Sequence, residues 1–569
     1  MRLTSLLIFL HLLPAFLQGQ GLIIPANAYV ISGNGNIVLR NNWTNNGSFT
    51  HNSGTVIFAG TTQTLNGTTS TSFNNMTIAA GSSTTISSAG HSLKAILLSN
   101  GTLNAGGNLT LLSTATQTAL IDGSGAGEVL GNVAMQRYLA SAFGYKYFSS
   151  PFVAATVDEF SDDINLSASF STFYRYDENL TSSGYVSYNT TSNILNPTQG
   201  YVANFGTSSA PATADITGVV NNHTLSATLY NHHQPYTLGF NLVGNPYPSP
   251  VDWDLAAGWT RTNIDNAIYY FNAGTTNQYT GTYSSYINGV SSNGIASNII
   301  AAMQGFFIHV SNGTYPVIGT LSVNNNARIN NLTPNFYRDG PLTMPLLRLT
   351  AAFEAGIADP LVVYFQDGAT PSFDREMDAI KLINTDSLVP SLYAISDDAI
   401  PLSICAWPAT YDSTRSIPLG LQIKHAGWIT FNTPDMERIP YSRHIYLYDA
   451  KTGITQDLQR DPQYRVYLEK DTEDRFAIVF RRKDPGQQPG DGSIFNAYSA
   501  DGKLYVYLDH LPDGECTVYV TNLLGQTIQQ TVLNGNGYHD LGSQFSSGLY
   551  IVSFYTKQHT SSKKVFISK

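Results

Sequence analysis

Short apolar strands alternate with turn residues over the first part of the chain, residues 20–135. Segments such as GTVIFAG, NNMTIAA and LKAILLS are separated by runs of Gly, Asn, Ser and Thr. The apolar positions Val38, Ile57, Ile78 and Leu97 follow one another at spacings of 19, 21 and 19 residues. A near-constant period of about 20 predicts a parallel β-solenoid, in which each coil buries its strands on the next. Because the period decays after Leu97, an irregular antiparallel sandwich remains the alternative.

Longer alternating strands follow, and they predict two β-sandwich-like domains. Aromatic-rich segments such as GYVANF and GFFIHV fall within residues 136–345, and LVVYFQ and HIYLYDA fall within residues 346–482. Alternation of apolar and polar positions is typical of strands with one buried face. KDPGQQPGDG, residues 483–492, has the composition of a linker. The predicted fold class is therefore all-β, with residues 493–569 as a small C-terminal domain.

Charged residues are scarce, and their density changes along the chain. They make up 12% of the sequence, the net charge is −10, and 42% of the residues are hydrophobic. This composition indicates a globular protein and argues against nucleic-acid binding, which needs clustered Lys and Arg. Residues 21–340 contain 21 charged residues and residues 341–569 contain 46. The shift indicates a change of domain type near residue 340.

The N-terminus has the pattern of a secretory signal peptide. Arg2 precedes the apolar run LLIFLHLLPAF, and the small residue Gly19 follows it. A positive start, a short apolar core and a small residue at the cleavage point define such a signal. We therefore predict that residues 1–19 are a signal peptide; a buried N-terminal helix is the alternative. No later segment reaches 18 uninterrupted apolar residues, so the mature chain is not expected to be transmembrane.

The two cysteines, Cys405 and Cys516, lie far apart in the sequence. In the segment ECTVYV, Cys516 alternates with Val518 and Val520, which places the thiol on the inner face of a strand. A buried thiol that packs as a small hydrophobic group is favoured over a disulfide.

The usual motifs of catalysis are missing from the sequence. HExxH, GxSxG, GxxxxGK[ST] and CxxC do not occur, and the glycine-rich GNGNIV and GSGAGEV are interpreted as turns. His223, His232 and His233 offer imidazoles, but adjacent strand residues point to opposite faces. They are therefore interpreted as loop histidines rather than metal ligands. The sequence predicts no enzyme, no cofactor and no metal.

Two acidic runs are candidates for a glycosidase site, which needs two carboxylates about 5–10 Å apart. Asp252 and Asp254 in PVDWDL can share one face of a strand, and Asp374, Glu376 and Asp378 form a second run. Nothing in either run marks an acid of raised pKa beside an ionised partner. A solvated acidic loop or a weak cation site is the preferred interpretation of both.

Aromatic side chains near the first acidic run could bind sugar rings. Tyr247, Trp253 and Trp259 are the candidates for stacking on a glycan. Burial in the core is the commoner use of such residues and remains the alternative.

The C-terminal domain resembles a known family. GKLYVYL, CTVYVTNLLGQTI, SGLYIVSF and the terminal KKVFISK occur in order within residues 493–569. Together they resemble the type A C-terminal sorting domain of the type IX (Por) secretion system of Bacteroidetes. The resemblance implies a small Ig-like sandwich, recognition by the type IX machinery and its sortase, and delivery through the outer membrane to the cell surface or medium. The residues it assigns to the sorting signal are Gly525, Gly548, Tyr550, Lys563, Lys564 and Lys569.

Upstream segments also resemble Bacteroidetes surface proteins, namely GFNLVGNPYPSPVDWD with IIAAMQGFFIHV, and DREMDAIKL with PSLYAIS. The sequence thus predicts an exported surface protein without enzymatic activity, adhesin-like, that binds a glycan or matrix ligand. Two alternatives stay open: a secreted hydrolase with a degenerate motif, and a structural component of the surface or of gliding. An acidic pair in a cleft would favour the enzyme, and a flat aromatic patch would favour binding.

Overall fold

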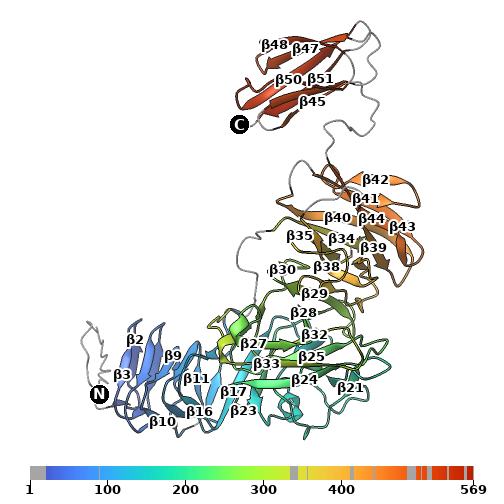
Figure 1. Ribbon diagram of the computed structural model, residues 1–569. Coiled ribbons are helices and arrows are strands. Elements are labelled where there is room, and N and C mark those ends of the chain that lie inside the picture. The colour runs from blue at the N-terminus through green and yellow to red at the C-terminus, as the bar shows by residue number, and fades with distance from the viewer. Residues whose placement is uncertain are drawn as a thin grey trace. The chain divides into compact units, whose positions relative to one another are not determined.

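The computed structural model describes most of the chain after residue 20 (Figure 1). The described residues are 21–88, 90–333, 344–354, 356–409, 415–439, 443–482, 495–500, 503–508, 515–534, 537–556 and 560–567. The predicted signal peptide, the predicted linker and Lys569 lie outside them. The chain forms two compact units: the second consists of Asp412–Arg415, Pro440–Tyr446 and Val479–Lys569, and the first contains the rest.

The regular structure is all-β, as predicted. Apart from three 3-10 turns, at Val157–Phe160, Ala256–Gly258 and Asn325–Ala327, every regular element in the described residues is a strand. The predicted domain boundaries stay predictions, and the buried clusters described below run across two of them.

The N-terminal part is a parallel β-solenoid of about five turns, which confirms the prediction. Three strands per coil stack on those of the next coil through parallel pairing. One sheet contains β1 (Leu22–Ile24), β4 (Trp43–Asn45), β7 (Gln63–Asn66), β10 (Ser83–Ile86), β13 (Thr102–Asn104) and β16 (Glu128–Leu130). A second contains β3 (Ile37–Leu39), β6 (Thr55–Phe58), β9 (Asn75–Ile78), β12 (Ile96–Ser99) and β15 (Leu120–Ile121). The third side has β2 (Tyr29–Ser32) paired with β5 (Ser48–His51), then β8 (Ser72–Phe73), β11 (His91–Leu93), β14 (Leu109–Leu111) and β17 (Asn132–Leu139).

The register separates inward from outward positions. It shows that the four apolar residues that define the period do not all face the core. Ile78 and Leu97 are fully buried, whereas Val38 and Ile57 point outward and are only half-buried. The coils pair Val38 with Ile57, but Ile57 with Thr77 rather than with Ile78. Because side chains alternate between the faces of a strand, one residue of difference in spacing moves a position to the other face.

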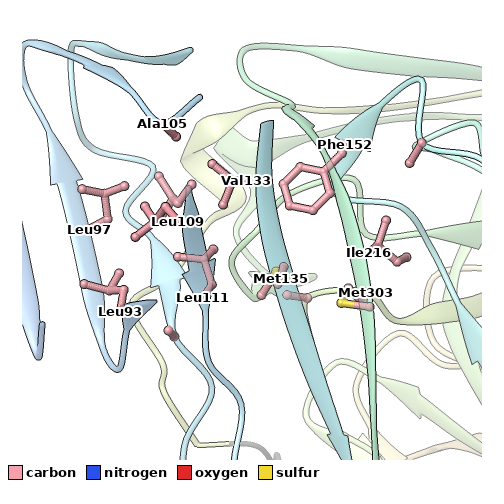
Figure 2. Packing of buried hydrophobic residues seen from close by; sticks show 14 of the residues in the cluster. Leu93, Leu97, Ala105, Leu109, Leu111, Val133, Met135, Phe152, Ile216 and Met303 are labelled. Carbon is pink, nitrogen blue, oxygen red and sulfur yellow. The ribbon is translucent and has the colours of Figure 1, made fainter. Parts of the chain in front are cut away.

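The last coils of the solenoid pack into the segment that follows. β17 pairs with β14 on one side and antiparallel with β23 (Ala212–Val220) on the other, and β23 pairs with β19 (Phe152–Val153). Figure 2 shows Leu109 and Leu111 on the solenoid side of β17, and Phe152 and Ile216 beyond it. The buried cluster therefore continues past residue 135.

Residues 145–323 form four further sheets. The first has the order β18 (Tyr145–Phe148), β22 (Tyr201–Asn204), β20 (Phe173–Tyr176) and β21 (Tyr185–Ser187). The second has the order β25 (Phe240–Gly244), β32 (Gly305–Val310), β28 (Ile264–Ala273), β29 (Gly281–Ile287) and β30 (Val290–Ser291). The others are β24 (Leu225–Asn231), β33 (Val317–Val323) and β27 (Trp259–Thr262), and the pair β26 (Val251–Asp252) and β31 (Ile299–Ile300).

A large sheet follows, built mainly from antiparallel strands. Its strands are, in order, β42 (Ile454–Asp457), β41 (Arg443–Asp449), β44 (Thr472–Arg482), β39 (Ser416–Gln422), β37 (Ser391–Ile395), β38 (Pro401–Pro408), β35 (Asp359–Gln366), β34 (Leu346–Phe353), β40 (Gly427–Glu437) and β43 (Gln463–Leu468), with β36 (Ala379–Ile380) beside β38. One buried cluster joins Tyr269 and Phe307 to Leu346, Tyr364 and Ile404. The regions before and after residue 345 thus share a hydrophobic core.

The C-terminal domain contains two sheets around one core. The first has β45 (Phe495–Ala500), β46 (Lys503–Leu508) and β49 (Gly537–Asp540), and the second has β48 (Thr527–Asn534), β47 (Glu515–Asn522), β50 (Gly548–Tyr555) and β51 (Thr560–Ile567). The core includes Cys516 and Val518, as the alternation predicts. Both cysteines of the chain are buried and free.

Candidate functional site

The closing strand of the C-terminal domain alternates strictly between buried and exposed side chains. On β51, Val565 and Ile567 lie in the core, while Phe566 between them is 65% exposed. Lys564 is exposed on the same outer face as Phe566, and Lys563 is half-buried on the other. The two predicted basic residues of the sorting signal that the structure describes therefore point to opposite faces.

The two glycines of the predicted signal differ in role. Gly525 has a φ of +79° in the hairpin between β47 and β48, and its N–H donates to the carbonyl oxygen of Asn522 at 3.0 Å. Gly548 instead opens β50 in extended conformation, paired with Ile567, and a Cβ there would meet nothing closer than 3.9 Å. Gly548 therefore lies within the strand, and the bend is at the preceding residue.

Tyr550 of β50 packs against the core of the C-terminal domain. Its ring contacts Phe545, with 5.6 Å between the ring centroids, and its hydroxyl donates to the carbonyl oxygen of Ser546 at 3.1 Å. The residue is half-buried at the margin of the core.

The three predicted sugar-stacking side chains are core residues. Tyr247 and Trp253 have no exposed surface, and Trp259 is 8% exposed. The indole N–H of Trp253 donates to the carbonyl oxygen of Asn266 at 2.8 Å. The indole N–H of Trp259 donates to the backbone carbonyl oxygen of Asp252, also at 2.8 Å. Rings enclosed in this way offer no face to an external glycan, so this prediction is wrong and the core alternative is right.

The GNPYPSP segment contains Tyr247 and precedes the two tryptophans. It is a structural junction. The side-chain amide of Asn245 donates to the carbonyl oxygens of Ser249 and Ala301, each at 2.9 Å, and its oxygen accepts from the N–H of Tyr247 at 3.0 Å. The N–H of Ile121, at the end of the solenoid, donates to the carbonyl oxygen of Pro248 at 2.9 Å. This segment therefore ties the solenoid to the following sheets.

Asp252 and Asp254 lie in one turn rather than across a cleft. One carboxylate oxygen of Asp252 accepts from the side-chain amide of Asn298 at 2.7 Å and from the N–H of Asp254 at 2.9 Å. The carboxylate of Asp254 accepts from the hydroxyl of Tyr286 at 2.5 Å. Partial burial raises the pKa of Asp254. Each carboxylate is engaged by neutral donors of the surrounding fold.

The second acidic run is also a turn. The carboxylate of Asp374 accepts from the N–H of Glu376 at 3.0 Å, and that of Asp378 accepts from the N–H groups of Asp374 at 2.7 Å and Ala406 at 2.6 Å. Asp378 is 1% exposed, and burial raises its pKa to about 7. The solvated-loop interpretation is therefore wrong for Asp378, which holds the turn against β38.

The predicted loop histidines have separate partners. His232 lies 2.7 Å from the buried carboxylate of Glu178 through its Nδ1 atom, and His233 stacks on Tyr315 with 4.4 Å between the ring centroids. Within the described residues, no group of three or more His, Cys, Asp or Glu side chains is placed to hold a metal ion.

An open depression of about 860 Å³ lies beside β43 and β44, lined by residues that include Gln422, Lys451 and the run 467–475. Its charged side chains have both signs. Arg475 is already held by the buried Asp449, with hydrogen bonds of 2.9 and 2.8 Å.

A layer of tyrosines covers one face of the sheet β18–β22–β20–β21. The hydroxyl of Tyr147 lies 2.6 Å from that of Tyr185, which lies 3.4 Å from that of Tyr283 on β29. Burial raises the pKa of all three phenols. The ring of Tyr147 also stacks on Phe271, with 4.9 Å between centroids. The interior of the layer is a packed core in which the phenol groups bond to one another.

The margin of this layer reaches the surface, and we call it the aromatic rim: Tyr145, Phe170, Tyr174 and Tyr279. Phe170 is 59% exposed and Tyr279 is 48% exposed, while the other two are half-buried. Ring centroids are 5.4 Å apart between Phe170 and Tyr279, and 6.2 Å apart from Tyr145 to both Tyr279 and Tyr174. Four aromatic rings thus form one continuous, partly exposed cluster.

Sequence reasoning missed the rim because its members come from separate segments. Tyr145 is on β18 and Tyr174 on β20, while Phe170 and Tyr279 lie in the loops before β20 and between β28 and β29. The available signal was the alternation in FGYKYF and TFYRYD, which places Tyr145 with Tyr147 and Tyr174 with Tyr176 on single faces. Only the pairing of both strands with β22 brings those faces together.

Comparison with known families accounts for nearly the whole described chain. Residues 33–480 match a family described as a domain of unknown function, DUF8693. The chain belongs to this family. Residues 500–568 match the secretion system C-terminal sorting domain. No curated protein matches the sequence.

The sorting domain establishes the route of the protein. It is a type IX secretion cargo of the kind found in Bacteroidetes, exported to the cell surface or secreted, and it interacts with the type IX machinery. Among the described residues, no helix is long and apolar enough to cross a membrane. The DUF8693 region carries no assigned activity, so its role must be argued from its own surface.

Proposed function

We propose that the DUF8693 region is an adhesin-like, non-catalytic binding domain that holds an uncharged extracellular glycan on the aromatic rim. The observation that carries the proposal is the exposure of Phe170 and Tyr279 within a cluster of four rings. A sugar ring has an apolar C–H face and a polar circumference, so a partly exposed aromatic ring can bury the first and leave the second in water.

Two rings of the rim are held in place by the layer beneath them, which supports a role in binding. Tyr145 and Tyr174 continue the buried tyrosine layer, and the hydroxyl of Tyr174 donates to the carbonyl oxygen of Ser171 at 2.7 Å. Rings that are already held in place lose little conformational entropy when a ligand binds. Lys146, the charged residue next to Tyr145, donates to the carbonyl oxygen of Phe143 at 2.8 Å. A neutral ligand fits this setting better than an anionic one.

The alternative of a secreted hydrolase has no comparable observation in its favour. The two acidic runs are turns in which the carboxylates accept hydrogen bonds from the chain itself. The rim contains no carboxylate of its own. Binding without turnover is therefore the function that the geometry supports best.

The test is a glycan array probed with the exported protein. Replacing Phe170 and Tyr279 together by Ala should weaken binding of the selected glycan about tenfold, at about 0.5–1.5 kcal/mol for each lost ring contact. Tyr236→Ala is the matched control, because Tyr236 is 71% exposed and lies outside the rim. Equal loss in the control and the double variant would contradict the proposal. Glycan cleavage that Asp252→Asn with Asp254→Asn abolishes would identify an enzyme instead.

A further inference from the structure

Within the described residues, the first coil of the solenoid has three strands without a partner along one edge. β1 and β3 are the terminal strands of their sheets, and β2 pairs only with β5 in the described chain. The backbone groups of Leu22 and Ile24 form hydrogen bonds with the second coil. The N–H of Leu22 donates to the carbonyl oxygen of Asn42, and the N–H of Asn46 donates to the carbonyl oxygen of Ile24. Since alternate amides of a strand point to opposite sides, those of Ile23 point away from the second coil.

The outward side chains of this coil differ from those of the coil beneath it. Ile23 is 69% exposed, Tyr29 is 59% exposed and Ile31 is 57% exposed. Their register partners on the second coil are hydroxyl residues, namely Thr44, Ser48 and Thr50. The first coil therefore exposes apolar side chains at positions where the second coil carries hydroxyl side chains.

Little protects this edge: one charged residue, Arg40, follows β3, and one proline, Pro25, follows β1. Between residues 21 and 93 the only charged side chain is that of Arg40, and the first acidic residue of the mature chain is Asp122. Native proteins usually protect a free strand edge with Lys, Pro, a bulge or a covering segment. If the signal peptide is cut near Gly19 as predicted, what remains ahead of Leu22 is too short to cover three strands.

The opposite end of the solenoid is occupied. β17 pairs along its length with β23, and the end of β15 bonds to Pro248 through the N–H of Ile121. A second copy cannot stack its first coil on this end, which excludes head-to-tail stacking of solenoid on solenoid. The remaining way to stack two solenoids coil on coil is head-to-head, with a two-fold axis across the solenoid and strands that pair antiparallel.

We infer that the first coil, β1 to β3, is a homodimerisation edge on which two copies of this protein join their solenoids head to head. Backbone hydrogen bonds across the edge supply the pairing. The two-fold axis lets one of the three strands pair with its own copy and exchanges the other two. Ile23, Tyr29 and Ile31 then lie along the junction with the first coil of the second copy. The near absence of charge in the coil means that no strong like-charge repulsion opposes this self-association.

Sedimentation equilibrium of the exported protein tests this inference. The wild type should show a concentration-dependent dimer, and Ile31→Lys should raise the dimer dissociation constant by about tenfold or more. Thr50→Lys is the matched control, one coil further in on the same face and in register with Ile31, and it should leave the dissociation constant unchanged.

A second pair of variants protects the test against a folding failure. Ile23→Lys should weaken the dimer as Ile31→Lys does, while Thr44→Lys, its register partner on the second coil, should not. Melting temperatures confirm that each variant is folded. A wild type that stays monomeric at every reachable concentration, an equal effect of the control variants, or open filaments would each overturn the inference.

Discussion

The solenoid and the sorting domain are both built from strands, yet they differ in the side chains that their edge strands carry. The first coil of the solenoid carries Ile23 and Ile31 at its edge, and its one charged residue is Arg40 at the end of β3. The last strand of the sorting domain, β51, is also an edge, and it carries Lys563 and Lys564. Lysines on an edge strand oppose pairing with other chains. The comparison indicates an edge protected from self-pairing at one end of the protein and an edge free to pair at the other.

The two regions also build their cores differently. In the solenoid, a core residue stacks on residues about 20 positions away, so its burial depends on the length of every coil turn. In the sorting domain, simple alternation along one strand decides burial, as Val565 and Phe566 show. Substitutions at inward-facing and outward-facing positions in each region test whether these two rules decide burial as described.

The largest expected effect is in the solenoid core. Ile78→Asp places a carboxylate at a fully buried position and should lower the free energy of unfolding by about 3–5 kcal/mol, because an unpaired buried charge is poorly solvated. Ile57→Asp, on the outward face, should cost under about 1 kcal/mol. Denaturant unfolding of the full chain measures both. Equal losses at the two positions would contradict the inward and outward assignment.

The next effect concerns export. Val565→Asp puts a charge into the small core of the sorting domain, whereas Phe566→Asp changes a side chain that is 65% exposed. The first should leave the protein in the periplasm, because the sorting fold is lost, and the second should leave that fold intact. Protease accessibility on intact cells of a type IX-competent host separates surface from periplasmic protein.

A fusion sharpens this result. Residues 493–569 behind a signal peptide and an unrelated fluorescent protein should reach the surface, and the same fusion without 565–569 should not. Surface delivery of both Val565→Asp and the truncated fusion would show that the closing strand is not needed for sorting.

Local pattern was enough for the all-β class and the solenoid, whereas the sorting domain followed from the resemblance of residues 493–569 to a known family. A period near 20 predicts stacked coils, but the face of each residue depends on coil lengths, so the period alone does not show that Ile57 faces outward and Ile78 inward. Trp253 and Trp259 could not be assigned to core or surface from sequence, because an indole buried against a carbonyl oxygen looks the same as an exposed one. The aromatic rim joins Tyr145 to Tyr279 across the sheets, and no local pattern encodes that.

A smaller effect separates the two glycines of the sorting signal. Gly525 has a φ of +79°, so Gly525→Ala should cost about 1–2 kcal/mol, the penalty of an L-residue in the left-handed region. Gly548 is extended and has open space around it, so Gly548→Ala should be neutral or stabilise β50 by about 0.5 kcal/mol. Thermal unfolding of the sorting domain within the full chain gives both values. A larger loss at Gly548 would show a steric role that the structure lacks.

The smallest expected effect is a difference in acid sensitivity. His51 on β5 is 7% exposed, and burial lowers the pKa of its imidazole, with a further contribution from Lys94. Burial also lowers the pKa of His91 on β11. Because the unfolded chain then binds the proton more tightly than the folded solenoid, stability is constant above the ordinary His pKa of about 6.5 and falls as the pH drops below it.

His51→Leu should therefore reduce the loss of melting temperature between about pH 7.5 and about pH 5, which bracket the ordinary His pKa. The remaining loss in the solenoid transition belongs in part to His91, and His51→Leu with His91→Leu should reduce it further. The sorting-domain transition of the same variants is the reference, because replacing His51 or His91 should leave it unchanged. If His51→Leu left the pH dependence of the solenoid unchanged, the buried imidazole would not be the group that acid titrates, and acid sensitivity would not distinguish the two regions.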